Sequence, residues 1–182
     1  FSDVGNMSTA TSILGESYAQ YLTGFDPNYY YNYRFSNGPI WADQLYTSLG
    51  FGPIGTLAAN DGAANINGTN FAWAESRSGA GTVQGIFENL QLQVGTYSTQ
   101  LANSNPALPA PSTTLFSIWS GANDVIAYVE SGDPVTPDQV ANNIALAITT
   151  LYAEGGRFFL VPNMLPFEKI PGYISDPIKG EL

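Results

Sequence analysis

The order of elements in the sequence predicts an α/β domain whose strands form a parallel sheet. Apolar runs typical of buried strands alternate with segments whose apolar residues recur at helical spacing. The clearest strand is Leu-Phe-Ser-Ile-Trp at 115–119. The clearest helix begins after Thr136, and a continuous apolar run at 157–161 follows it. Strand, helix and strand in this order are typical of a parallel sheet covered by helices.

The first helix is predicted to begin in the segment Ser36-Asn37-Gly38-Pro39. Pro39 suits the first helical position, and Asn37 or Gly38 can cap the helix. The free N–H groups at a helix start can hold an anion, and Gly38 can bring its N–H close to a ligand because it has no side chain. A plain helix cap explains the same spacing.

A short strand and a long helix are predicted next. The strand is 70–73, and the helix takes its apolar residues from Val83 to Leu101 at helical spacing. Three prolines in 103–112 then indicate a loop before the strand at 115–119.

A tight turn at Gly121 is predicted to end the strand 115–119. Asn123 and Asp124 follow the turn, and 125–130 has a helical pattern. In open α/β sheets, ligands bind outside the carboxyl ends of the strands. Asn123 is therefore a candidate donor of a neutral hydrogen bond to a reacting oxygen. Taken alone, the stretch favours the alternative, in which Asn123 or Asp124 caps the helix.

The last predicted helix has strong signals at both ends. Thr136-Pro137-Asp138-Gln139 forms a capping-box pattern with proline at the first helical position. An apolar stripe runs through 140–151, and Gly155-Gly156 ends the helix. We expect one domain over 1–182, with an irregular tail at 167–182 that shows no periodicity.

Composition narrows the classes of function. Five basic and fifteen acidic residues give a net charge of −10, which argues against a nucleic-acid or anionic-membrane partner. Cysteine and histidine are both absent, which removes thiolate metal sites and the commonest general base. We expect no metal and no cofactor. Few lysines and the sequons Asn6-Met7-Ser8 and Asn67-Gly68-Thr69 are consistent with a secreted, extracellular protein.

Three blocks, in the right order, resemble the GDSL or SGNH family of serine ester hydrolases. Residues 1–6 resemble the second half of the family's first block. Residues 34–41 resemble the second block, which supplies an oxyanion-hole glycine, and this resemblance assigns that role to Gly38. Residues 120–124 resemble the third block, Gly-x-Asn-Asp, and assign Asn123 to the oxyanion hole. The resemblance implies a three-layer α/β/α, flavodoxin-like SGNH-hydrolase fold.

The resemblance also implies acyl transfer from an ester. A serine attacks the carbonyl, a histidine takes the serine proton, and an aspartate orients the histidine. The oxyanion is held by the serine N–H, the Gly38 N–H and the Asn123 side-chain amide. The implied partners are small-molecule, lipid or acetylated-carbohydrate esters.

The sequence departs from the family pattern in its catalytic groups. Ser2 aligns with the family's second serine, so the nucleophile position would precede Phe1, and Ser2 itself is interpreted as a turn or cap residue. The Asp-x-x-His block is absent because the chain has no histidine. We therefore expect the native polypeptide to extend before Phe1 and after Leu182, and the 182 residues alone to be inactive. A smaller departure is Ala74-Glu75, where relatives commonly carry glycine.

A second hypothesis is a non-catalytic binding module on the same fold. The segment Phe25 to Phe35 is rich in aromatic residues that can hold a carbohydrate or an apolar ligand. A long loop that packs down with its own aromatic rings explains the same composition.

Overall fold

The computed structural model describes residues 6, 31, 36–51, 69–83, 85, 87–104 and 108–169. The chain divides into two compact units. The first unit consists of Phe1–Ser76 and Ala80–Ala110, and the second of Arg77–Gly79 and Pro111–Leu182.

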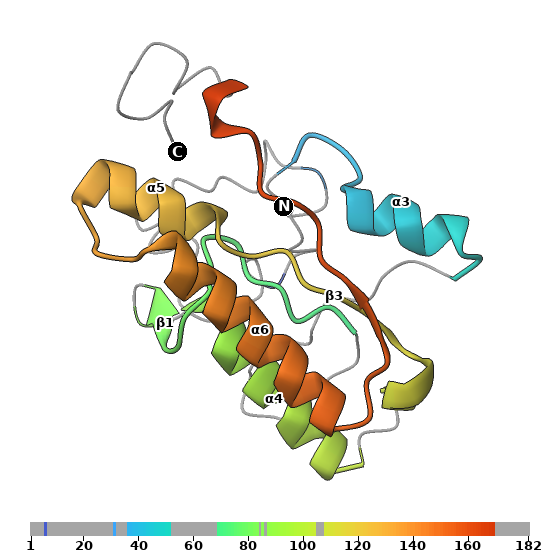
Figure 1. Cartoon of the computed structure of the whole chain (residues 1–182). Helices are drawn as coiled ribbons and strands as arrows, with labels where there is room; N and C mark the ends of the chain where they lie inside the picture. The colour runs from blue at the N-terminus through green and yellow to red at the C-terminus, as the bar shows by residue number, and fades with distance from the viewer. Residues whose placement is uncertain are drawn as a thin grey trace. The chain divides into compact units, whose positions relative to one another are not determined.

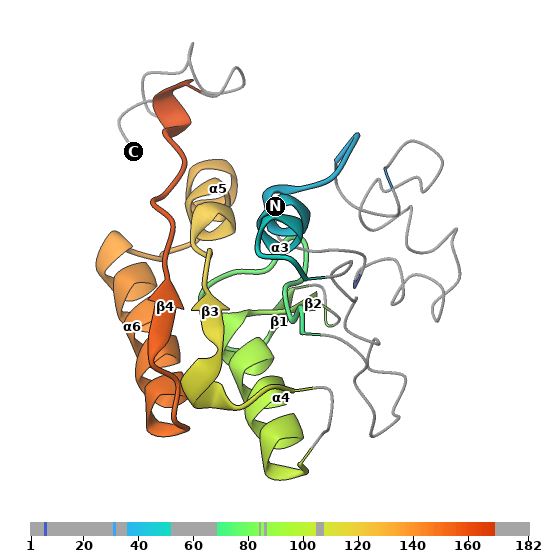
Figure 2. The same cartoon turned by 90° about the vertical axis from the view of Figure 1, so that its right-hand side faces the viewer.

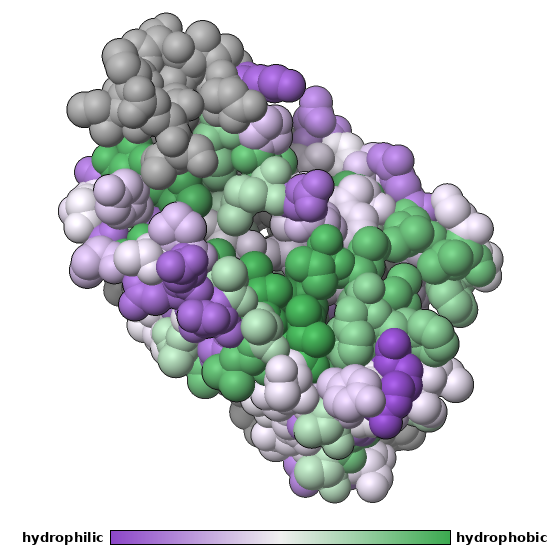
Figure 3. Space-filling view, in the orientation of Figure 1, coloured by the Kyte–Doolittle hydropathy of each residue, from purple (hydrophilic) through white to green (hydrophobic). Residues whose placement is uncertain are grey.

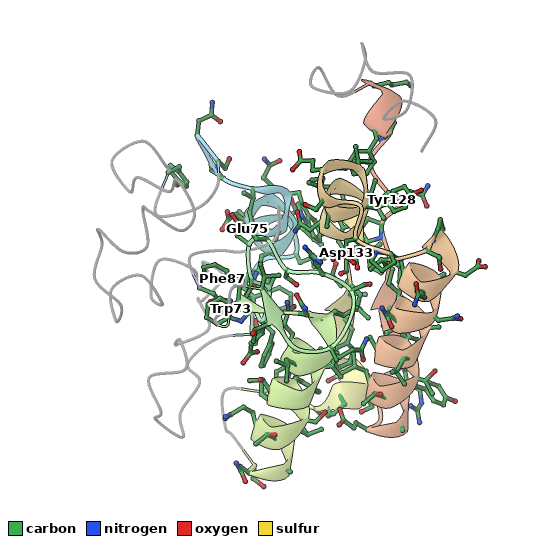
Figure 4. All side chains as sticks on the ribbon, turned by 90° about the vertical axis from the view of Figure 1, so that its left-hand side faces the viewer. Trp73, Glu75, Phe87, Tyr128 and Asp133 are labelled. Carbon is green, nitrogen blue, oxygen red and sulfur yellow. The ribbon has the colours of Figure 1, made fainter. Side chains whose placement is uncertain are left out.

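The described residues of the first unit form two helices and a small antiparallel hairpin (Figure 1). Its elements in chain order are α3 (Trp41–Ser48), β1 (Thr82–Val83), β2 (Phe87–Glu88) and α4 (Leu90–Ala102). Among these described residues, Trp73, Ala74 and Phe87 form a hydrophobic core cluster, with Val83 packed against it. The rings of Trp73 and Phe87 lie side by side, with centroids 6.3 Å apart (Figure 4).

The single helix predicted from Val83 to Leu101 is wrong in its first half. Val83 and Phe87 are opposite each other in the hairpin β1–β2, and the helix α4 begins only at Leu90. The backbone of Gly85 has φ +76°, a left-handed conformation that a continuous helix excludes. Asn89 precedes α4 in an extended conformation, and its side-chain amide donates to the Ala80 carbonyl at 3.1 Å. The apolar residues that suggested one helix therefore belong to two elements, the hairpin β1–β2 and the helix α4.

The short strand predicted at 70–73 is also not formed, apart from one bridge residue at Asn70. The side chain of Asn6, which is completely buried, bonds this segment instead. Its amide donates to the carbonyls of Asn70 and Ala72 at 3.0 and 2.8 Å. Two carbonyls that a neighbouring strand would otherwise satisfy are thus satisfied by one side chain.

The second unit contains a parallel pair of strands joined through two helices (Figure 2). Its elements in chain order are the 3₁₀ helix η2 (Pro111–Thr113), β3 (Leu115–Ser117), α5 (Ala122–Ser131), α6 (Pro137–Ala153), β4 (Phe158–Leu160) and the 3₁₀ helix η3 (Phe167–Lys169). The register pairs Leu115 with Phe158 and Ser117 with Leu160. The predicted parallel pairing of the two apolar runs is confirmed. The helix η3 lies at the start of the range predicted as tail, and 170–182 lie outside the described residues.

The helix α6 confirms the signals at both of its ends. The Thr136 hydroxyl accepts from the Gln139 N–H at 3.2 Å, and the Gln139 side chain accepts from the Thr136 N–H at 2.8 Å. Pro137 is the first helical residue. Gly155, just beyond the helix, has φ +107°, so the change of direction uses the freedom of glycine. Local sequence signals therefore mark both ends of this helix.

The strands β3 and β4 are less buried than their apolar sequence predicts. One face of the pair carries Leu115 and Phe158, which are 47 % and 57 % exposed. On the other face, the rings of Phe116 and Phe159 stack with centroids 5.6 Å apart. Hydrophobic side chains lie along the β4 segment on the surface in Figure 3. Each strand therefore exposes the side chains of one face and partly buries those of the other, whereas the sequence predicted that both faces are buried.

Candidate functional site

Asn123 lies in the first turn of α5, directly after the end of β3. Gly121 occupies the N-cap position with φ +112°, and no side chain caps the helix. The helix starts at Ala122, three residues earlier than its pattern predicted. The interpretation of Asn123 or Asp124 as a helix cap is therefore wrong. Asn123 is half-buried, while the next residue, Asp124, is almost completely buried.

The turn at Gly121 is tightly packed. A β-carbon at this position would lie 2.6 Å from the Met164 Cε and 2.7 Å from the Val140 Cγ1. Both distances are shorter than carbon–carbon contacts in proteins allow. Glycine is therefore required at 121 for two separate reasons, the left-handed backbone and the lack of space.

Asp124 belongs to a buried polar network. Its Oδ2 accepts from the Ser78 N–H at 2.9 Å, and its Oδ1 accepts from the Ser78 hydroxyl at 2.9 Å. The Ser78 Oγ in turn accepts from the Asn143 Nδ2 at 3.0 Å. Ser78 is 0 % and Asp124 is 3 % exposed. The network joins the first turn of α5 to the segment 77–79 and to α6.

A salt bridge joins the same segment to the other end of α5. The Arg77 guanidinium lies 2.6 Å from a carboxylate oxygen of Asp133, and about a third of each side chain is exposed. Asp133 follows Gly132, the C-cap of α5. The short segment 77–79 therefore contacts residues at both ends of α5.

Gly38 lies in a loose turn before α3. Its N–H donates to the Ser36 hydroxyl at 3.3 Å, and a β-carbon at this position would meet nothing within 4 Å. The predicted cap is wrong: Ile40 is the N-cap, α3 begins at Trp41, and Pro39 precedes the helix. The Ile40 N–H donates to the Asp43 carboxylate at 2.9 Å. Asp43 therefore satisfies the helix start and leaves Gly38 outside it.

Glu75 has the left-handed backbone conformation, with φ +61°. It is the second residue of the Ala74-Glu75 pair, at which the family resemblance leads us to expect glycine. Burial raises the pKa of the Glu75 carboxyl above its ordinary value of 4.5. The departure therefore places both strain and a half-buried acid in the segment after Trp73.

Ser78 and Asn143 were not identified from the sequence. Neither lies in a recognisable motif, and Ser78 precedes its partner Asp124 by 46 residues. One signal was available: Asn143 lies between Val140 and Ala147 on the buried stripe of α6. A polar residue on such a stripe needs a buried partner.

The structure assigns the two predicted oxyanion residues to different units. Gly38 belongs to the first unit and Asn123 to the second. Their convergence on one oxyanion stays a prediction. Most of the aromatic segment Phe25 to Phe35 lies outside the described residues; Tyr31 is the exception.

The described residues contain neither a candidate metal site nor a candidate membrane span. Within these ranges, no group of three or more acidic, histidine or cysteine side chains is placed to hold a metal ion. Among the same residues, no helix has the length and apolar character needed to cross a membrane.

The described residues form an α/β arrangement in which a parallel strand pair leads into the helix that carries Asn123 and Asp124. The chain belongs to the GDSL-like Lipase/Acylhydrolase family, whose family model matches residues 4–180. It is 26 % identical over 183 residues to a phosphatidylcholine-sterol acyltransferase from Aeromonas hydrophila. The alignment covers 98 % of this chain and 49 % of that relative, so the chain spans about half the length of the curated relative it matches. Ester hydrolysis and acyl transfer are the chemistry of the family.

Proposed function

We propose that this chain forms the oxyanion-stabilising part of a carboxylic ester hydrolase that works by serine acyl transfer. The observation that carries the proposal is the family match over residues 4–180, which includes both Gly38 and Asn123. The substrates we propose are esters of small molecules, lipids or acetylated carbohydrates. A three-layer α/β/α arrangement and an extracellular location belong to the same proposal.

The chemistry assigns one task to this chain. When a serine oxygen bonds to the ester carbonyl carbon, the carbonyl oxygen takes the electron pair of its π bond and becomes an oxyanion. The tetrahedral intermediate then expels the alcohol, and water releases the acid in a second, equivalent step. The Gly38 N–H and the Asn123 Nδ2 donate to the oxyanion in both steps.

The surroundings of Asn123 support this role. The residue is half-buried, so its amide can reach a ligand, and it lies in the first turn of a ten-residue helix. The start of a helix carries a partial positive charge, which favours a developing negative charge nearby. The Asn123 amide at this position can donate a hydrogen bond to the same negative charge that the helix start attracts.

The surroundings of Gly38 support it in a different way. Its N–H makes a hydrogen bond of 3.3 Å, which is near the long limit for such bonds. A charged oxygen accepts a shorter and stronger bond than a neutral hydroxyl does. An oxyanion can therefore replace Ser36 as the acceptor.

The serine and the histidine of the mechanism are not assigned to residues of this chain, which contains no histidine. Our proposal assigns them to a longer natural polypeptide, and the test compares that polypeptide with the 182-residue chain. We expect the polypeptide to hydrolyse a p-nitrophenyl ester and the chain alone to show no turnover. Comparable turnover by both would contradict the assignment of the missing groups.

Asn123→Ala in that polypeptide tests the oxyanion role. We expect kcat to fall about 10²–10³-fold, which is typical of the loss of one oxyanion-hole donor. Asn142→Ala is the matched control, because Asn142 is an exposed asparagine on α6 of the same unit. An equal kcat for both variants would refute the assignment of Asn123.

A further inference from the structure

A buried carboxyl next to the candidate oxyanion donor has no task in the proposed mechanism. Asp124 is 3 % exposed, and both of its oxygens are used by one residue, Ser78. Burial of such a group is costly unless every polar atom has a partner. The two bonds from Ser78 supply these partners and hold the Asp124 carboxyl in one position.

We infer that Asp124 is a positioning residue for Asn123, and that Ser78 and Asn143 hold Asp124 in place. The inference rests on the proposed function, because it concerns the direction of the Asn123 amide. Asp124 receives two hydrogen bonds of 2.9 Å from Ser78, one from its backbone and one from its side chain. The bond of 3.0 Å from Asn143 fixes the Ser78 hydroxyl in turn.

Helix geometry connects the two neighbouring residues. Successive residues of an α-helix point about 100° apart around its axis. Fixing Asp124 on the buried side of α5 therefore fixes the rotation of the first turn and the direction in which Asn123 leaves it. Gly121 alone would not do this, because glycine has no side chain that could cap α5. A catalytic donor displaced by about 1 Å can lose about 10²-fold in rate.

The hydrogen-bond pattern predicts how two substitutions of Asp124 will differ. Asp124→Ala removes both acceptors of the Ser78 groups. Asp124→Asn keeps one oxygen for the Ser78 N–H, and its amide can donate to the Ser78 Oγ. The asparagine variant should therefore recover most of the activity that alanine loses.

The test is a double-mutant cycle in the natural polypeptide, assayed with a p-nitrophenyl ester. We expect Asp124→Ala to lower kcat roughly 10- to 100-fold with little change in KM. We expect the same substitution to have almost no effect on kcat in the Asn123→Ala background, because no amide is left to position. An equal loss of kcat in both backgrounds would show a purely structural role and would overturn the inference.

Ser78→Ala is the second variant and is needed if Asp124→Ala does not fold. It removes only the hydroxyl bond to Asp124 and the acceptor of Asn143. We expect a smaller loss of kcat with the same dependence on Asn123. Asp138→Ala, an exposed aspartate at the start of α6, is the matched control.

A second readout does not depend on catalysis. The NMR signals of the Asn123 side-chain amide report its order directly. We expect Asp124→Ala, but not Asp138→Ala, to lower the order parameter of that amide, and an unchanged value would overturn the inference. Failure of the proposed function looks different: Asn123→Ala would then leave kcat unchanged, whatever the amide order shows.

Discussion

The turns around Gly38 and Gly121 carry the same proposed task and are built in opposite ways. The Gly38 turn has one long internal hydrogen bond and free space around the glycine. The Gly121 turn has a left-handed backbone, close contacts from Met164 and Val140, and a buried polar network directly after it. A backbone donor brings its own geometry, whereas a side-chain donor such as Asn123 must be held by its neighbours. We therefore expect substitutions at the Gly38 turn to change activity without changing stability, and substitutions at the Gly121 turn to change both.

The largest effect is expected for Gly121→Ala. The substitution forces a side chain into the left-handed region and into contact with two packed side chains. We expect a loss of about 2 kcal/mol or more in the free energy of unfolding, from backbone strain and overpacking together. Urea denaturation measures this loss. A loss below about 0.5 kcal/mol, the usual range of surface substitutions, would remove the contrast between the turns.

The next effect is expected at Glu75, in the same unit as Gly38. Burial raises its pKa above 4.5, so the folded state binds the proton more tightly than the unfolded state does. This contribution to stability is complete below pH 4.5 and is lost as the pH rises through the raised pKa. Glu75→Gln should therefore gain stability relative to the wild type as the pH is raised from 4 to 7.

Thermal unfolding of wild type and Glu75→Gln across that pH range checks the sign. Glu130→Gln is the matched control, because Glu130 is exposed on α5. Glu75→Gly removes the left-handed strain as well as the acid, and we expect a gain of about 1 kcal/mol at pH 4 that becomes larger as the pH is raised to 7. If Glu75→Gln loses stability with rising pH as steeply as the wild type, the acid is not the cause of that loss.

A smaller effect is expected for the Arg77–Asp133 pair. The two side chains are about one-third exposed, so water and salt weaken their attraction. We expect a coupling energy of about 0.5–1 kcal/mol from the cycle of Arg77→Met and Asp133→Asn. The coupling should decrease when the salt concentration is raised. A coupling energy that does not change with salt would contradict the expectation that solvent screens this ion pair.

The smallest effect on stability is expected for Gly38→Ala. Nothing lies within 4 Å of the added β-carbon, and the backbone of Gly38 is not left-handed. We expect a change within about 0.5 kcal/mol in the free energy of unfolding. In the natural polypeptide the new methyl group should still lower kcat/KM, because it stands beside the proposed oxyanion donor. Unchanged activity would show that no ligand approaches this glycine.

The sequence predicted those parts of the fold that depend on local chemistry. The capping box at Thr136 and the glycine at 155 mark the two ends of α6 through neighbouring residues. The parallel pairing of the two apolar runs followed from the strand–helix–strand order. The prediction of one helix from Val83 to Leu101 was wrong because Val83 and Phe87, which face each other across a short hairpin, also lie at helical spacing. Gly85, whose backbone is left-handed, is the residue in that stretch that indicates a turn instead of a continuous helix.

The candidate site was predictable only in part. Gly38 and Asn123 came from a resemblance to family blocks, and their roles stay predictions. The support of Asn123 could not be predicted, because Ser78 bonds Asp124 across 46 residues of sequence and Asn143 bonds Ser78 across 65. Asn6 shows the same limit: its bonds to Asn70 and Ala72 replace a strand that propensity predicted. Long-range side-chain bonds leave no periodic trace in a sequence.

The burial of Asn6 has a practical consequence for how this protein is produced. The side-chain nitrogen to which an N-linked glycan would attach is the atom that donates to the two carbonyls. Sugar transfer to the sequon during synthesis and closure of the first unit are therefore mutually exclusive. A yeast or insect host should yield a mixture of folded, sugar-free molecules and misfolded, glycosylated ones, whereas a bacterial host avoids this competition.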